Sequence, residues 1–339
     1  MYKKTIFNIN NNSITYYGPE KCKNVKINAI LLGDSWVDCL WNPMIETWPV
    51  KLCVKKEWTY INIAKAGTTV ADIKEQIALL NKFADYYNVL INKNTLWIMH
   101  SGGNDVLFNL FLNFNKVLYD IFKMYSLKLY DNVNIVKSQS NTFIPNIAKN
   151  ISLSTYEIID IINNTYAPKK IFVSSNTISN AMPFTFLVTC FIAPFYTHYV
   201  IDTIALLCSL YLTCELNNFQ NKNKKNLNII FFQEDKAIIK HKNNISWCKD
   251  GFHPTNLGHE YIMNEAILSL DENKSIYSIY KEKNNELSSL YNNQNSLFTK
   301  LSIIVNVVLL FIIGFFIMSI IMIVKCIYFI THPTFFKHF

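Results

Sequence analysis

The chain has 339 residues, of which 50% are hydrophobic, so it is long enough for one domain of roughly 250 residues with additional segments. Its formal net charge is +8, but every basic residue is a lysine and the lysines are scattered, which argues against a nucleic-acid partner. The eight cysteines lack Cys-x-x-Cys spacing, so neither a metal site nor a disulfide framework is predicted.

The chain begins with a polar segment that we expect to be an N-terminal extension, residues 1–24. Its first 17 residues are rich in asparagine and contain no apolar run of the kind that a secretory signal peptide needs. The main domain is expected over residues 25–270, with insertions at about 106–147 and 181–216.

A strand followed by a serine opens this domain. Residues 27–32 form an apolar run that predicts a buried parallel strand, and Gly33, Asp34 and Ser35 follow it directly. Residues 36–40 are expected to begin a helix. A serine at such a strand-to-helix turn exposes its hydroxyl at the carboxyl end of the sheet, where backbone N–H groups point toward the atom it attacks. The alternative is an ordinary turn, because Gly, Asp and Ser are all common turn residues.

Two further strands precede residues that can bind an oxyanion. Residues 59–64 predict a strand that ends before Gly67, whose backbone N–H is not obstructed by a side chain. Residues 95–100 predict another buried strand, and Asn104 follows it with a side-chain amide. Such donors stabilise the oxyanion that forms when a carbonyl is attacked. Each residue alone is equally well explained as a turn residue, and only the ordered set favours acyl transfer.

Helices alternate with the predicted strands. Residues 70–83 have apolar positions at helical spacing, and residues 154–164 predict a second helix. Apolar strands follow at 170–175 and 227–233, which brings the number of predicted strands to five. Strands that alternate with helices predict a parallel sheet and an α/β fold. The first insertion, 106–147, is aromatic and poorly patterned, and we expect it near the active site.

One of the seven histidines fits the role of a general base, which a serine hydroxyl needs to become a nucleophile. Only His253 has a carboxylate three residues upstream with a glycine between them, so a tight loop can bring Asp250 to its Nδ1 and leave Nε2 facing Ser35. A helix is expected to follow over residues 256–270. The alternative is that Asp250 and Thr255 only cap this helix and that His253 is a surface residue.

Together, these blocks resemble those of the SGNH hydrolases, also called the GDSL esterase and lipase family. Ser35 in Gly-Asp-Ser matches the family's nucleophile, Gly67 matches its second block, and Asn104 in Gly-Gly-Asn-Asp matches its third. Asp250 and His253 match the family's Asp-x-x-His pair. The resemblance therefore implies a catalytic triad of Ser35, His253 and Asp250.

The resemblance also implies a three-layer α/β/α fold with a flavodoxin-like, parallel, five-stranded sheet, and no cofactor. It implies an oxyanion hole formed by the backbone of Ser35 and Gly67 and by the side-chain amide of Asn104. Two positions depart from the family pattern. Trp36 stands where a leucine often follows the serine, and Ala64 stands where the second block often has another glycine. Neither departure removes a catalytic group.

The C-terminal part of the chain predicts a membrane anchor. Residues 301–324 contain no charged residue and, at about 1.5 Å per residue, are long enough to cross a bilayer core of about 30 Å. Because lysines bracket this run, we expect a single transmembrane helix over 300–325, followed by a short tail over 326–339, rather than a buried core helix. Residues 271–299 are charged and rich in Asn and Ser, as expected for a linker. The distribution of lysines favours a catalytic domain on the cytosolic side.

The second insertion, 181–216, is another apolar segment, without lysine and interrupted by two prolines. Because strands on both sides of it belong to one sheet, it crosses a membrane either twice or not at all, and two crossings in so few residues would be tight. We expect packed helices that form an apolar cap over the acyl site or dip into lipid, with ordinary core helices as the alternative.

The sequence thus predicts a membrane-anchored serine esterase or lipase that hydrolyses acyl esters through an acyl-serine intermediate. We expect small-molecule or lipid-like esters as substrates and contact with the membrane through residues 301–324. Two alternatives stay open. One is an O-acyltransferase, which passes the acyl group to another alcohol, and the other is a membrane-anchored binding or scaffold protein on an inactive hydrolase fold.

Overall fold

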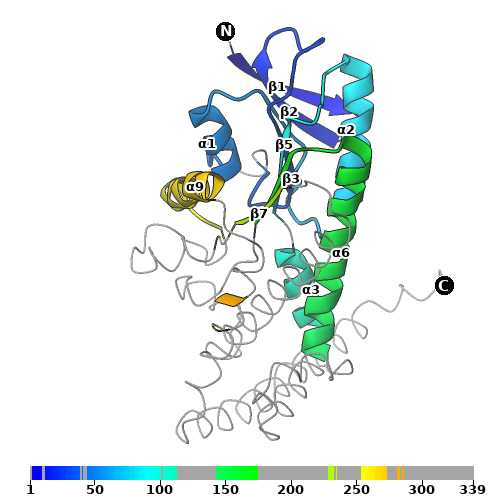
Figure 1. Ribbon diagram of the computed structural model, residues 1–339, viewed down its shortest axis with the longest axis vertical. Helices are drawn as coiled ribbons and strands as arrows, with labels where there is room; N and C mark the ends of the chain where they lie inside the picture. Colours follow the sequence, from blue (N-terminus) through cyan, green and yellow to red (C-terminus); the bar gives the residue numbers. More distant parts are fainter. Residues whose placement is uncertain are drawn as a thin grey trace, which may run out of the picture.

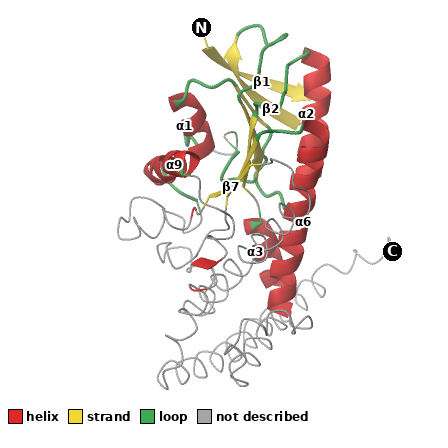
Figure 2. Cartoon of the chain, viewed as in Figure 1, coloured by secondary structure: helices red, strands yellow, loops and turns green. Residues whose placement is uncertain are grey.

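The computed structural model describes residues 2–9, 12–38, 40, 44–100, 102–112, 143–174, 228–232, 234, 253–272, 281–282 and 285. These residues form one sheet with helices on both faces (Figures 1 and 2). The strands are β1 (Tyr2–Ile9), β2 (Asn12–Pro19), β3 (Ala29–Gly33), β4 (Tyr60–Asn62), β5 (Leu96–His100), β6 (Lys170–Ser174) and β7 (Asn228–Phe232). The helices are α1 (Trp48–Lys55), α2 (Ile73–Tyr87), α3 (Gly103–Leu112), α6 (Phe143–Tyr166) and α9 (Asn256–Asp271).

The strand order in the sheet is β1-β2-β4-β3-β5-β6-β7. The five strands predicted from the sequence are all present, and each pairs in parallel with its neighbours in the order β4-β3-β5-β6-β7. This is the flavodoxin-like order, in which the chain reverses direction across the sheet beside its first parallel strand. The carboxyl ends of these strands therefore lie at one edge, where the Gly-Asp-Ser block follows β3.

The sheet is larger than predicted, because part of the expected N-terminal extension belongs to it. Strands β1 and β2 form an antiparallel hairpin, and β2 continues the sheet by pairing antiparallel to β4. The sheet is therefore mixed and has seven strands rather than five. The alternation in β2 explains the difference, since Ile14 and Tyr16 lie on one face and are completely enclosed by the core.

Two apolar cores lie on opposite faces of the sheet. Ile30 and Leu32 of β3 pack with residues of α2 and α6, whereas Ala29 and Leu31 of the same strand pack with residues of α1 and α9. Figure 1 shows these helix pairs on either side of the sheet. Because both faces of β3 are covered, the strand is apolar at every position, as its sequence predicted.

Three predicted helices are present and one is not. Residues 70–83 correspond to α2, residues 154–164 lie within the longer α6, and residues 256–270 correspond to α9. The helix expected over 36–40 was wrong, because residues 35–37 form a single turn and α1 begins only at Trp48. Side-chain bonding ends this turn, since the Asp38 carboxylate accepts hydrogen bonds from the Leu40 and Ala66 backbone N–H groups.

Several predicted segments lie outside the described residues. Among the described residues, no helix is both long and apolar enough to cross a bilayer. The predicted transmembrane helix is not part of that set. The segments outside the described residues are most of the first insertion (113–142), the second insertion (181–216), most of the linker, the anchor (300–325) and the tail (326–339).

Candidate active site

A serine and a histidine meet at the carboxyl end of the sheet. Ser35 lies in the turn after β3, and His253 lies shortly before α9. Ser35 Oγ and His253 Nε2 are 2.9 Å apart, although 218 positions separate the two residues in the sequence. At this distance, an imidazole nitrogen that carries no proton can accept the proton of the hydroxyl. Asp250, which the sequence predicts at Nδ1 of His253, lies outside the described residues, so this contact stays a prediction.

Helix α9 holds His253 in place. Thr255 caps the helix, because its side chain accepts a hydrogen bond from the Gly258 backbone N–H at 3.2 Å. Further along, Nδ1 of His259 accepts a hydrogen bond from the Trp48 backbone N–H at 3.1 Å, which joins α9 to the first turn of α1. The position of His253 therefore depends on the packing of α9 and α1 against the sheet.

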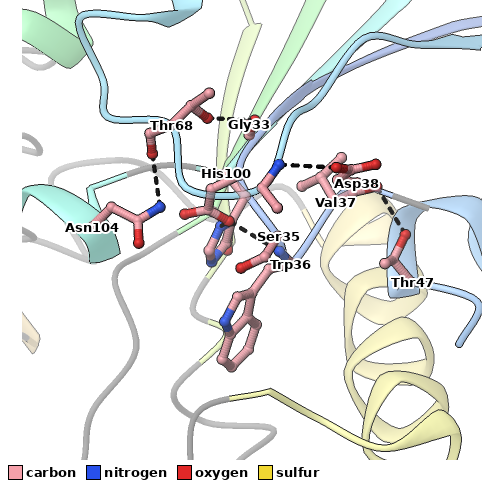
Figure 3. Close-up of polar contacts among 12 residues, drawn as sticks. Gly33, Ser35, Trp36, Val37, Asp38, Thr47, Thr68, His100 and Asn104 are labelled. Atoms are coloured by element: carbon pink, nitrogen blue, oxygen red, sulfur yellow. Dashed lines mark hydrogen bonds and ion pairs between the residues drawn. The ribbon is translucent and has the colours of Figure 1, made fainter. Parts of the chain in front are cut away.

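Asn104 lies in the first turn of α3 and contacts the loop that contains Gly67. Its side-chain Nδ2 donates a hydrogen bond to the Thr68 carbonyl oxygen at 2.8 Å (Figure 3). The next residue, Asp105, accepts a hydrogen bond from the Val70 backbone N–H at 2.9 Å. Burial raises the pKa of the Asp105 carboxyl, although the bond from Val70 acts in the opposite direction. Asn104 and Asp105 thus hold the loop that contains Gly67 in place. Because a side-chain amide nitrogen has two N–H groups, Asn104 retains one for an oxyanion.

Two backbone N–H groups complete the candidate oxyanion hole. Within the described part of the chain, neither the Ser35 nor the Gly67 backbone N–H donates a hydrogen bond. Gly67 has φ of +81°, and a Cβ at this position would meet no atom within 4 Å. The backbone conformation, rather than crowding, therefore accounts for the glycine. The structure places Ser35, Gly67 and Asn104 at the same edge of the sheet, each after a strand that the sequence predicted.

The end of β3 is held by the side chain of Gln76, which comes from α2. Gln76 Oε1 accepts a hydrogen bond from the Gly33 N–H at 2.9 Å, and its Nε2 donates one to the Gly33 carbonyl at 2.8 Å. The same carbonyl accepts a hydrogen bond from Thr68 Oγ1 at 2.9 Å. A Cβ on Gly33 would lie 2.1 Å from the carbonyl oxygen of His100, so only glycine fits here.

The turn that contains Ser35 is tied to its surroundings on the other side as well. The Val37 carbonyl accepts a hydrogen bond from Thr47 Oγ1 at 3.0 Å (Figure 3). It accepts another from Asn62 Nδ2 at 2.8 Å. Asp38 Oδ2 accepts the Ala66 N–H at 2.9 Å. The nucleophile turn and the Gly67 loop are therefore connected through buried side chains.

A buried charged cluster lies beneath this turn. His100, at the end of β5, is only 3% exposed, and its Nδ1 lies 3.1 Å from Asp34 while its Nε2 lies 3.0 Å from Glu234. Ser174 Oγ donates a hydrogen bond to Glu234 at 2.6 Å. The ring of His100 stacks on the indole of Trp36, with centroids 5.3 Å apart and 8° between the ring planes.

Sequence reasoning missed three residues of this arrangement. Gln76 is a polar residue on the buried face of an amphipathic helix, and that mismatch is a signal that could have identified it. His100 stands at the end of an apolar strand, where a charged side chain needs a buried partner. Glu234 lies two positions after the end of the last strand, but only the fold shows that it reaches His100.

No family model and no curated protein matches the sequence. The solved structures that resemble the chain include lipases and a phospholipase. They include a GDSL-like lipase from Parabacteroides merdae (12% identity, 74% of this chain and 98% of that chain, TM-score 0.41). An extracellular lipase from Streptomyces rimosus has 12% identity, and a phospholipase A1 from Streptomyces albidoflavus has 16%. Each of the two alignments covers 72% of this chain and 99% of the other, with a TM-score of 0.44.

Proposed function

We propose that this protein is a serine hydrolase that cleaves carboxylic esters through an acyl-serine intermediate. The observation that supports this proposal most directly is the 2.9 Å distance between Ser35 Oγ and His253 Nε2. An ordinary turn at Ser35 and a surface histidine next to a helix cap would not need to approach one another. Their contact gives the hydroxyl a base at hydrogen-bond distance, which is what nucleophilic catalysis by serine requires.

In the first step, Ser35 Oγ attacks the ester carbonyl carbon while His253 Nε2 takes the hydroxyl proton. A C–O bond forms to the serine, and the carbonyl oxygen becomes an oxyanion. The backbone N–H groups of Ser35 and Gly67 and the amide of Asn104 are the donors for this charge. The imidazolium of His253 then protonates the leaving alcohol as its C–O bond breaks, which leaves the acyl group on Ser35.

In the second step, water takes the place of the alcohol. His253 removes a proton from the water, the water oxygen attacks the acyl carbon, and the acid is released as the proton returns to Ser35 Oγ. In this proposal, Asp250 orients the imidazole from the Nδ1 side. No cofactor enters either step.

The proposed substrates are lipid-like acyl esters, and the proposed location is a membrane surface. Residues 301–324 are uncharged and long enough to span the hydrocarbon core, which supports a single-pass C-terminal anchor. The distribution of lysines on either side of this run supports a catalytic domain on the cytosolic side. The apolar segment 181–216 supports an apolar cap for the acyl chain. A catalytic domain held at a bilayer meets esters that partition into lipid.

Ester hydrolysis by matched serine variants tests the proposed activity. The full chain in detergent is given p-nitrophenyl esters of increasing acyl length, and Ser35→Ala is compared with Ser13→Ala, which changes an exposed serine in β2. We expect Ser13→Ala to hydrolyse the esters as the wild type does and Ser35→Ala to be inactive. An inactive wild type favours the scaffold alternative. Formation of a new ester in place of free acid, when an alcohol is added, favours the O-acyltransferase.

Membrane extraction tests the proposed anchor. Replacing Leu309 and Ile313 by lysine puts two charges, each costing about 3 kcal/mol, near the centre of the predicted span. We expect the wild-type chain to resist alkaline carbonate extraction and the double variant to be released. If the double variant stays bound, residues 181–216 are the attachment. Protease added to sealed cells tests on which side of the membrane the catalytic domain lies, and a cytosolic domain should stay intact.

A further inference from the structure

His100 is placed where its charge affects the nucleophile turn. It is buried between two carboxylates that are themselves buried, Asp34 on the turn after β3 and Glu234 after β7. Two buried carboxylates facing one another without a cation would be strongly destabilising. A histidine with one ring nitrogen on each carboxylate offsets this cost only when both nitrogens carry protons. The two distances, 3.1 Å to Asp34 and 3.0 Å to Glu234, therefore favour an imidazolium.

The charged groups around His100 agree with this state. Burial by itself lowers the pKa of His100, but the charges of Glu234 and Asp34, together with their hydrogen bonds, raise it to about 10. Among the described residues, His259 of α9 and Asp105 of α3 also interact electrostatically with this cluster. His259 is neutral over the physiological range, because burial lowers its pKa to about 3. The carboxylates on either side thus determine the charge of His100.

The charged cluster holds Trp36, the residue after the nucleophile, through two contacts. Asp34 Oδ1 contacts His100 Nδ1 at 3.1 Å and accepts the Trp36 backbone N–H at 3.0 Å. The imidazole also stacks on the Trp36 indole, with centroids 5.3 Å apart. A cation over an aromatic face within about 6 Å is attracted by the ring. Both the backbone and the ring of Trp36 are therefore held by the same cluster, one residue away from Ser35.

The imidazolium also has an electrostatic consequence. Asp34 directly precedes the nucleophile, and its negative charge, if uncompensated, would oppose the oxyanion that forms next to the Ser35 backbone N–H. The positive charge of His100, 3.1 Å from Asp34, offsets part of this charge, since Glu234 shares the same imidazolium.

We propose that His100 is a positioning residue for acyl transfer, acting as a buried imidazolium that fixes Trp36 beside the nucleophile. This inference rests on the proposed hydrolase function. His100 does not touch the substrate, and it acts through Asp34 and Trp36. A tryptophan after the serine, where related enzymes often have leucine, provides the aromatic face that an imidazolium can bind.

Nitrogen NMR of the full chain, labelled with ¹⁵N-histidine in detergent, tests the charge state directly. We expect one of the seven histidines to remain doubly protonated at about pH 9, and its signals to disappear in His100→Gln. Histidine signals that are all neutral at that pH would overturn the proposal. This spectrum needs no catalytic activity, so it is independent of the hydrolase assay.

The pH dependence of Ser35 labelling by a fluorophosphonate tests the role in acyl transfer. Glu234→Gln keeps an oxygen near His100 but removes a charge that raises its pKa, so labelling should begin to fall about one pH unit earlier on the alkaline side than in the wild type. Glu157→Gln removes a carboxylate from an exposed ion pair with Lys74 and is the matched control. We expect His100→Gln to lower the labelling rate about 10- to 100-fold at neutral pH, and the difference from the wild type should shrink on the alkaline side, where His100 itself loses its charge.

The outcomes distinguish a failure of the proposed role of His100 from a failure of the proposed hydrolase function. If Glu234→Gln and Glu157→Gln give the same pH profile, or if His100→Gln is labelled as fast as the wild type, the role of His100 is overturned and the hydrolase function stands. A wild-type chain that is not labelled at all overturns the hydrolase function and, with it, this role of His100.

Discussion

On the serine side of the site, buried polar side chains from several elements bind the backbone of the nucleophile turn. Gln76 of α2 bonds both backbone groups of Gly33, Asn62 of β4 bonds the Val37 carbonyl, and the charged cluster lies beneath them. On the histidine side, His253 precedes a capped helix whose buried residues pack on α1 and the sheet. The first side is held mainly by hydrogen bonds and the second mainly by apolar packing.

This difference predicts how the two sides respond to mutation. Hydrogen bonds depend on direction, and on the serine side they connect the Ser35 turn, the Gly67 loop and Asn104 to one another. A single change to one of the hydrogen bonds that join these three parts should affect several oxyanion donors together. Apolar packing tolerates small changes, so on the histidine side only the loss of the base itself should affect the rate strongly.

The largest effects are expected when either reacting group is removed. Ser35→Ala and His253→Ala should each lower kcat/KM for a p-nitrophenyl ester by at least about 10⁴-fold, because the hydroxyl and its base act as a unit. The double variant should be no slower than either single variant. Additive losses, measured in a double-mutant cycle by steady-state kinetics, would contradict a serine and histidine that work together.

A smaller loss is expected at the oxyanion donor. Asn104→Ala should lower kcat about 10²-fold with little change in KM, since the amide binds the charge that appears only in the transition state. Asn109→Ala is the control, because Asn109 lies on the same helix and donates to the Asp105 carbonyl instead. Equal kinetics for the two variants would exclude Asn104 from the oxyanion hole.

The two hydrogen bonds between Gln76 and Gly33 are expected to affect stability more than chemistry. Gln76→Leu leaves the buried Gly33 N–H without its acceptor and should lower the free energy of unfolding by about 2 kcal/mol. Lys74 lies on the same helix as Gln76, and Lys74→Ala breaks an exposed ion pair with Glu157 of α6, which should cost less than about 1 kcal/mol. Chemical denaturation of both variants measures the difference. Similar losses would mean that the hydrogen bonds between Gln76 and Gly33 contribute little to the free energy of unfolding.

The smallest effects are the pH slopes of stability, which have opposite signs on the two sides. Between the usual histidine pKa of about 6.5 and about 10, native His100 binds a proton that the unfolded chain lacks, so stability should fall as pH rises. Between about 6.5 and 3, the unfolded chain binds a proton that native His259 lacks, so stability should fall as pH drops.

Melting temperatures across this range measure both slopes. His100→Gln should flatten the alkaline slope alone, and His259→Gln, which keeps an acceptor for the Trp48 N–H, should flatten the acid slope alone. If each variant flattened both slopes, the two histidines would not be independent.

The parallel strands could be predicted from the sequence, because each is a short apolar run bounded by turn residues. The Ser35, Gly67 and Asn104 blocks follow three of these strands, so their meeting at one edge could be predicted from topology. The hairpin β1-β2 could not, since its few buried apolar residues, such as Ile14 and Tyr16, lie in a polar segment that is rich in asparagine. The helix predicted after Ser35 failed because Asp38 bonds to backbone groups, one of them across the turn in the Gly67 loop.

Contacts between distant polar residues were the least predictable part. Gln76 and Gly33 are 43 positions apart, and nothing local in the sequence identifies an amide in α2 as the partner of a strand end. The ion pair of His100 and Glu234 likewise depends on the neighbouring positions of β5, β6 and β7 in the sheet. Hydrophobic pattern determines the layers, but pairing of buried polar groups is determined only when the layers are assembled.

The central claim is that Ser35 is made nucleophilic by His253, and mass spectrometry of the fluorophosphonate adduct tests it most directly. In the predicted reaction, a bond forms between Ser35 Oγ and phosphorus, fluoride leaves, and His253 takes the hydroxyl proton. We expect a single adduct on the peptide that contains Ser35, and its loss in His253→Ala at equal protein concentration. An adduct on another residue, or an adduct on Ser35 that forms as fast without His253, would contradict the account.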